Sequence, residues 1–98
     1  MLVQQKERDN KGFFFIEEEE VQLAEMDYSL SQPDIMVILH TEVDESLKGK
    51  NIGNQLLDHA VKYAREKNFK IIAICPFAKS VFEKRHEEFK DVLKSWNS

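Results

Sequence analysis

The segment 43–54, VDESLKGKNIGN, follows an apolar run, precedes a helical pattern and has the residue types of an anion-binding loop. The first amides of a helix have no internal partners and carry partial positive charge, which attracts phosphate-like groups. Gly49 and Gly53 allow a ligand to approach the backbone closely. Lys48 and Lys50 add positive charge at the same place. A solvated polar turn fits the same residues, whereas a Walker loop and a three-glycine dinucleotide motif do not.

Three further side chains could carry proton or group transfer: His40, Glu42 and Cys75. A histidine acts as a general base near neutral pH, and a cysteine beside a histidine can become a thiolate nucleophile. Strict strand alternation puts His40 and Glu42 on one face together with the apolar Met36 and Ile38. Packing for Cys75, a half-buried position for His40 and a solvated strand end for Glu42 are the alternatives. Cys75 and the three scattered histidines lack metal-ligand spacing, so no metal site is expected.

Hydrophobic periodicity predicts the elements that position these residues. Strands are expected at 2–6, 13–17, 20–30, 35–43 and 71–75. Helices are expected at 51–67, with one apolar stripe, and at 77–85, with a further helical segment at 88–96. The helix between two apolar strands indicates a crossover with parallel neighbours, and the short turns before it indicate antiparallel strands. The expected fold class is α+β (mixed α/β): a mostly antiparallel sheet with one βαβ crossover, in the order β-β-β-β-α-β-α.

Two of the expected strands have irregular patterns. In the segment 20–30 the phase of the apolar residues slips near Leu23 and Ala24, which indicates a β-bulge. In the segment 35–43 apolar residues occupy both faces, which is typical of a central strand in a covered sheet.

The composition fits one domain spanning residues 1–98. Hydrophobic residues make up 42% and the net charge is -4, so the basic footprint of a nucleic-acid binder is absent. The polar N-terminal residues do not resemble a secretory signal, and no apolar run is long enough to span a bilayer. Cys75 is the single cysteine, so no intrachain disulfide can form and a cytoplasmic location is expected. Leu93 and Trp96 leave a monomer or a weak homodimer open.

The loop resembles the acetyl-CoA loop of the GNAT (N-acetyltransferase) superfamily, whose pattern is Gln/Arg-x-x-Gly-x-Gly/Ala at a strand-to-helix junction. Here the pattern is Lys48-Gly49-Lys50-Asn51-Ile52-Gly53. Lys48 replaces the Gln or Arg, and Asn51 replaces the central glycine.

The segment 75–86 is similar to a second block of that family, Asn-x-x-Ala-x-x-x-Tyr-Glu-Lys-x-Gly-Phe. The matching positions are Ala78, Glu83 and Lys84. The departures are Cys75 for the Asn, Phe82 for the Tyr and His86 for the Gly. The resemblance covers residues 11–93, and the chain looks like a member of a small subfamily of minimal GNAT-like proteins.

The resemblance implies a GNAT-like fold that binds acetyl-CoA or CoA. The pyrophosphate would bind the amides of residues 48–54. The thioester arm would lie between the strands that end near Val43 and begin near Ile71, which are expected to splay apart there. The residues expected to bind the cofactor are Thr41, Val43, Lys48, Gly49, Lys50, Asn51, Ile52, Gly53, Asn54, Pro76, Phe77 and Phe82.

The resemblance also bears on catalysis, because the tyrosine of the second block is the proton donor in many GNAT enzymes. Phe82 has no proton to give. Cys75 and His40 are therefore expected to face the thioester, with Cys75 accepting the acetyl group or protonating CoA, and with Glu42 as a further base. We expect an acetyltransferase for an unidentified acceptor. A CoA-binding or sensing module without turnover and a structural or interaction domain are the alternatives.

Overall fold

Five strands form one sheet, in the spatial order β1-β2-β3-β4-β5. The structure is a computed structural model that describes residues 2–94. At Ser31 it describes the backbone alone. The strands are β1 (Gln4–Arg8), β2 (Lys11–Glu18), β3 (Val21–Gln32), β4 (Ile35–Val43) and β5 (Lys70–Ala73). Neighbours from β1 to β4 pair antiparallel, and β4 pairs parallel with β5. The predicted mixed, mostly antiparallel fold is confirmed.

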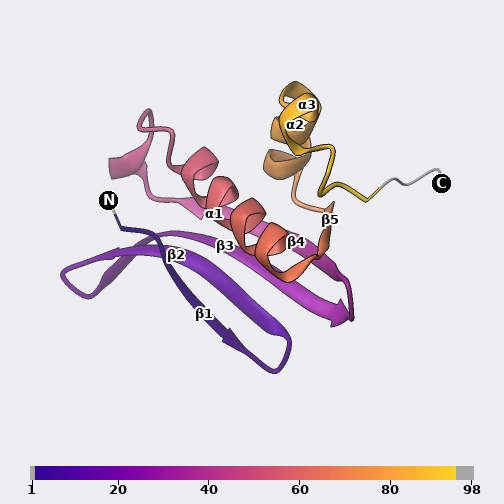
Figure 1. Ribbon diagram of the computed structural model, residues 1–98. Coiled ribbons are helices and arrows are strands. Elements are labelled where there is room, and N and C mark those ends of the chain that lie inside the picture. Colours follow the sequence, from indigo (N-terminus) through magenta and orange to yellow (C-terminus); the bar gives the residue numbers. More distant parts are fainter. Residues whose placement is uncertain (1, 95–98) are drawn as a thin grey trace.

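The helices lie on one side of this sheet. They are η1 (Glu45–Leu47, a 3-10 turn), α1 (Ile52–Lys67), α2 (Pro76–Lys84) and α3 (His86–Phe89). Figure 1 shows α1 lying along the sheet, with α2 and α3 next to it near β5. Within residues 2–94, none of these helices is long and apolar enough to cross a membrane.

The core lies between α1 and the sheet. The predicted apolar stripe of α1 is buried at Leu56, Leu57, Ala60, Val61 and Ala64. It packs against buried side chains of the inner strands, Phe14, Met26, Met36 and Ile38. Burial of each leucine side chain contributes roughly 2 kcal/mol, so this stripe is a main source of stability.

The predicted bulge in β3 is present. Ile16 pairs with Ala24, and the next residue of β2, Glu17, pairs with Gln22. Leu23 is the extra residue, as the slip in apolar phase indicates.

A second bulge, in β4, was not predicted and changes which residues share a face. Tyr28 pairs with Ile38 and Asp27 with His40, so Leu39 is the extra residue. Beyond it, Thr41 and Val43 pair with Met26 and Ala24, which belong to the core facing α1. His40 and Glu42 therefore point to the opposite face and are exposed. The prediction that they share a face with Met36 and Ile38, in a strand covered on both sides, is wrong.

The C-terminal part also differs from the prediction of a helical segment at 88–96. α3 ends at Phe89, and the chain then forms a parallel bridge between Leu93 and Ile71. The Ile71 amide donates to the Val92 carbonyl, and the Lys94 amide donates to the Ile71 carbonyl. The open edge of β5 offers these backbone groups partners that a continuing helix would forgo. Residues 95 and 96 lie outside the described part.

A hydrogen-bonded cluster attaches the edge strand β1 to the core. The Tyr28 hydroxyl donates to Glu7 at 2.7 Å and accepts from Gln5 at 2.7 Å. The Tyr63 hydroxyl donates to the same Glu7 oxygen at 2.8 Å. Burial is the main cause that raises the pKa of Tyr63 to about 12. Glu7 thus joins β1 to both β3 and α1.

Replacing Tyr63 with phenylalanine removes one of these bonds and keeps the ring. We expect the free energy of unfolding to fall by about 1 kcal/mol. For a chain of this size that lowers Tm by about 4–8 °C. Thermal unfolding followed by circular dichroism measures the change, and an unaltered Tm would show that the Tyr63 bond contributes nothing.

Candidate functional site

The bulge in β4 opens the sheet between β4 and β5. Pairing of these strands runs from Ile35 with Lys70 to Ile38 with Ala73. The amides of Ile74 and Cys75 then both donate to the Ile38 carbonyl, at 2.9 and 3.2 Å. β5 ends there and the chain enters α2, whereas β4 continues to Val43. The predicted splay between these two strands is therefore present, and it lies at the carboxyl end of β5, next to Cys75.

A groove of about 310 Å³ lies beside this opening, at the start of α1. It is lined by Thr41, Val43, Leu47, Lys48, Gly49, Asn51, Ile52, Gly53, Asn54 and Phe77. All of them except Leu47 are residues that the sequence predicts to bind the cofactor. The structure thus brings most of the predicted set together, and their binding of a ligand stays a prediction. Leu47 is the lining residue that the sequence analysis missed. As the single apolar residue between Asp44 and Asn51, it could have been predicted from this contrast to face the groove.

Three predicted residues lie outside this groove. Lys50 and Pro76 are exposed. Phe82 is buried against Phe89, with ring centroids 5.4 Å apart, and lines a different cavity, near Leu93. Its position is explained by core packing.

The backbone at the start of α1 fits an anion. Gly49 and Asn51 have φ angles of 83° and 60°, in the left-handed region. The helix has no side-chain cap at Asn51, and among the described residues no acceptor is found for the amides of residues 52–54. Such amides favour negative charge. An added Cβ at Gly49 would meet nothing within 4 Å, so this part of the loop faces open space.

The acidic residues before the loop are held in the η1 turn. Asp44 accepts from the amide and the hydroxyl of Ser46 at 2.9 and 2.6 Å, and these bonds hold its pKa below the usual range. Glu45 pairs with the Lys48 ammonium group at 3.1 Å. Both carboxylates thus have partners of their own within the turn.

The first turn of α2 packs directly on the first turn of α1. A Cβ added at Gly53 would lie 2.5 Å from Cζ of Phe77. Glycine at position 53 is therefore required by the Phe77 ring. This contact holds the start of α2, and with it Cys75, next to the groove.

Cys75 borders the groove at the opening of the sheet. It is the N-cap residue of α2, and its side chain is buried. The thiol donates to the Thr41 hydroxyl at 3.3 Å, and Thr41 lines the groove. Two residues far apart in the sequence, one on β4 and one between β5 and α2, thus meet at this edge.

Comparisons with known proteins identify relatives of this chain. The sequence pattern of a family described as GCN5-related N-acetyl-transferase matches residues 13–92. The solution structure of a GCN5-like protein from Staphylococcus aureus is 38% identical with a TM-score of 0.73, over 96% of this chain and 90% of that chain. The chain belongs to the GCN5-related N-acetyltransferase family.

Other solved structures with lower identity share the fold. A protein of Clostridium acetobutylicum, described as a predicted acetyltransferase and solved with acetyl-CoA, is 20% identical with a TM-score of 0.64, over 78% of this chain and 56% of that chain. An aminoglycoside N-acetyltransferase in complex with CoA is 12% identical with a TM-score of 0.58, over 79% and 67%. A search of curated protein sequences finds no match.

In this GCN5-related chain, His40 lies apart from Cys75. The His40 Nε2 atom is 3.1 Å from a Glu42 carboxylate oxygen, and this bond raises the pKa of His40. Its cross-strand partner is Asp27, on the face turned away from α1 and from Thr41. The structure does not bring His40 and Cys75 together on one face, so the expected pairing of the two is wrong.

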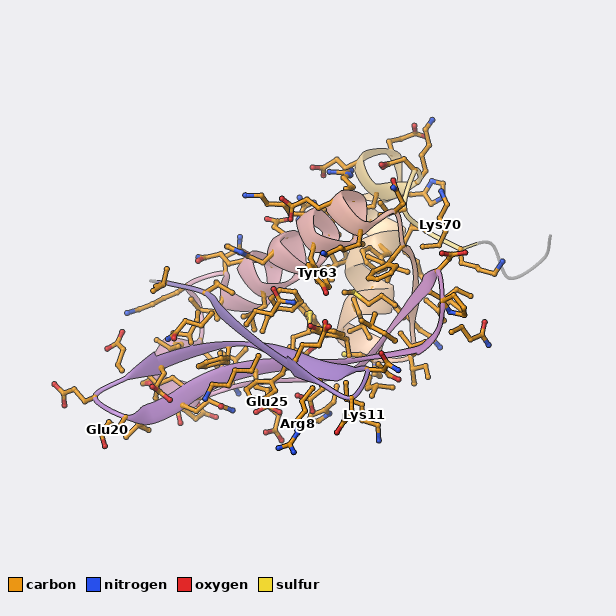
Figure 2. All side chains as sticks on the ribbon, turned by 60° about the horizontal axis from the view of Figure 1, so that its bottom comes forward. Arg8, Lys11, Glu20, Glu25, Tyr63 and Lys70 are labelled. Carbon is orange, nitrogen blue, oxygen red and sulfur yellow. The ribbon has the colours of Figure 1, made fainter. Side chains whose placement is uncertain are left out.

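The face opposite the helices carries a carboxyl cluster that sequence reasoning missed. Figure 2 shows Glu25 pointing away from α1, whereas Tyr63 lies between α1 and the sheet. Glu25 and Asp27 pair across the strands with Glu42 and His40. Burial, followed by a hydrogen bond with Glu25, raises the pKa of Asp27 from 3.8 to about 7, against the opposing effect of His40. The bulge in β4 creates this cluster, so strict alternation could not find it.

The raised pKa of Asp27 makes stability depend on pH. The pKa of about 7 keeps the proton on Asp27 in the folded chain up to about pH 7, whereas the unfolded chain loses it near the ordinary pKa of 3.8. The free energy of unfolding therefore falls as the pH rises from about 4 to about 7. We expect Asp27→Asn to remove this fall and to be about 1 kcal/mol more stable at pH 8, because solvent screens most of the charge effect. Urea unfolding between pH 4 and 8 measures this change in the free energy of unfolding, with Asp34→Asn as the control. An equal dependence on pH in the wild type and in both variants would disprove the prediction.

Proposed function

We propose that this protein is an acetyltransferase that takes acetyl-CoA as its donor and binds the CoA pyrophosphate at the N-terminus of α1. The observation that carries the proposal is the uncapped first turn of α1, which lines a groove beside the opening between β4 and β5. Relatives solved with acetyl-CoA and with CoA support the choice of ligand.

The remainder of the donor fits the edge of β4. Within the described residues no strand pairs with β4 on the β5 side beyond Ile38. Backbone groups along residues 39–43 are thus available to amide groups of the pantetheine arm. An arm along this edge brings the thioester toward Thr41 and Cys75, where the sheet opens.

Cys75 is the side chain that we assign to the chemistry. The departing CoA sulfur needs a proton, and Phe82 cannot supply one. The Cys75 thiol carries a proton, borders the groove and hydrogen-bonds to Thr41. It would give that proton to the CoA thiolate as the acceptor takes the acetyl group, and the proton lost by the acceptor would restore the thiol.

The acceptor is proposed to approach from the side of the sheet that bears no helix. Within residues 2–94 the helices all lie on the other side (Figure 1). The chain spans 56% and 67% of the two longer acetyltransferases. An open approach suits a large or flexible acceptor. A cytoplasmic location and a monomer or weak homodimer stay predictions.

Turnover separates this function from a CoA-binding module. The purified protein would be incubated with acetyl-CoA and a panel of small primary amines, a lysine-containing peptide and a small thiol. Chromatography would follow free CoA, and mass spectrometry would follow the acetylated products and Cys75. Acceptor-dependent release of CoA supports the acetyltransferase. Tight binding with no release in any reaction favours a binding or sensing module, and a stable acetyl group on Cys75 would make this residue the acetyl acceptor.

A further inference from the structure

Arg85 joins the α2–α3 junction to the start of α1. Its guanidinium group packs over the Phe89 ring, with Cζ 4.6 Å from the ring centroid. Its Nε atom is 2.7 Å from a Glu88 carboxylate oxygen, and one terminal nitrogen is 3.2 Å from Asp58. The other terminal nitrogen donates to Oδ1 of Asn54 at 3.1 Å. With 30% of its side chain exposed, Arg85 is held from several sides.

The bond to Asn54 fixes the orientation of its side-chain amide. A guanidinium group has only donors, so it can bond to the oxygen of that amide and not to its nitrogen. The nitrogen of Asn54 then points the other way and donates to Oδ1 of Asn51 at 2.9 Å. Asn51 is the residue with left-handed φ that precedes α1, and both asparagines line the groove.

We propose that Arg85 is a positioning residue for CoA: through Asn54 it holds Asn51 in the conformation that presents the first amides of α1 to the pyrophosphate. This inference rests on the proposed function. Arg85 does not line the groove and acts on the ligand only through the two asparagines. A chain of fixed dipoles of this kind lowers the cost of ordering the loop when an anion binds.

The test compares Arg85→Gln with Arg65→Gln. Arg65 also joins α1 to the chain after α2, through a bidentate ion pair with Asp91 whose two nitrogen–oxygen distances are 3.0 Å, but it lies at the other end of α1. Each variant loses one surface ion pair that joins α1 to the chain after α2, Arg85 with Asp58 or Arg65 with Asp91. Both substitutions should therefore lower Tm to a similar extent. We expect Arg85→Gln alone to raise the Kd for CoA, by about fivefold, the change that corresponds to one lost hydrogen bond.

A double-mutant cycle with Asn54→Ala shows whether Arg85 acts through Asn54. If it does, Arg85→Gln adds nothing to the Kd of the Asn54→Ala protein. In the ligand-free protein, the Gln55 amide donates to the Asn51 carbonyl at 3.2 Å, so its hydrogen exchange should quicken in Arg85→Gln and stay unchanged in Arg65→Gln.

The outcomes separate the two proposals. Unchanged Kd and exchange in Arg85→Gln, beside a wild type that binds CoA, would overturn the role of Arg85 and leave the proposed function standing. Equal effects of the two arginine variants on Kd would show a general loss of stability and would also overturn it. A wild type that does not bind CoA would overturn both.

Discussion

Replacing Gly53 with valine is expected to weaken CoA binding at least about tenfold and to destabilise the fold. The first added carbon would lie 2.5 Å from the Phe77 ring, and the ring fills the space between the first turns of α1 and α2. Overpacking of this kind costs about 1–3 kcal/mol. The ring or the first turn of α1 must move, which displaces the amides proposed to bind the pyrophosphate. We expect the Kd for CoA to rise by at least about tenfold, measured by isothermal titration calorimetry.

The Phe77 ring provides the matched control for this prediction. Gly53→Ala adds a single carbon in contact with the ring, and Phe77→Leu makes room for it. The double variant should recover Tm and CoA affinity relative to Gly53→Ala alone. Gly53→Val that binds CoA like the wild type would contradict the placement of the ligand at this turn.

Replacing Cys75 with alanine is expected to remove turnover while leaving CoA binding intact. Loss of a positioned proton donor typically slows a reaction by about 10²–10⁴-fold. Cys75 is not among the residues that line the groove, and alanine fits the same buried space. The release of CoA should thus fall by at least about a hundredfold, with the Kd for CoA changed less than about twofold.

Two companion variants identify what the thiol does. Cys75→Ser keeps a proton and a hydrogen bond to Thr41, and should retain part of the activity. Thr41→Val removes the partner of the thiol and keeps Cys75 itself. Unchanged turnover in Cys75→Ala would reduce Cys75 to a packing residue.

The parts of the fold that follow from local pattern could be predicted. The stripe from Leu56 to Ala64 repeats with the period of a helix, and one face of α1 is buried as expected. Gly49 and Gly53 mark the loop because glycine has conformational and steric properties of its own. The bulge at Leu23 was visible because it shifts apolar residues from one phase to the other.

The features that depend on contacts between distant residues could not be predicted. The bulge in β4 falls at Leu39, which belongs to a continuous run of apolar residues. The sequence therefore shows no slip in the apolar phase at that position. That bulge places Thr41 on the side of the sheet that faces α1 and His40 on the opposite side. For this reason the prediction that His40 and Cys75 lie together is wrong. Arg85 resembles any charged residue at a helix end, and its role depends on Asn54, which is distant in the sequence and lies on another helix.

The central claim is that the start of α1 binds the pyrophosphate of CoA. The most direct test is an NMR titration of the labelled protein with acetyl-CoA and, separately, with CoA, following the backbone amides. We predict the largest shifts at residues 48–54 and at Thr41 and Val43, with similar maps for both ligands except near Cys75. No shift in these residues at millimolar ligand, or shifts confined to another surface, would contradict the claim.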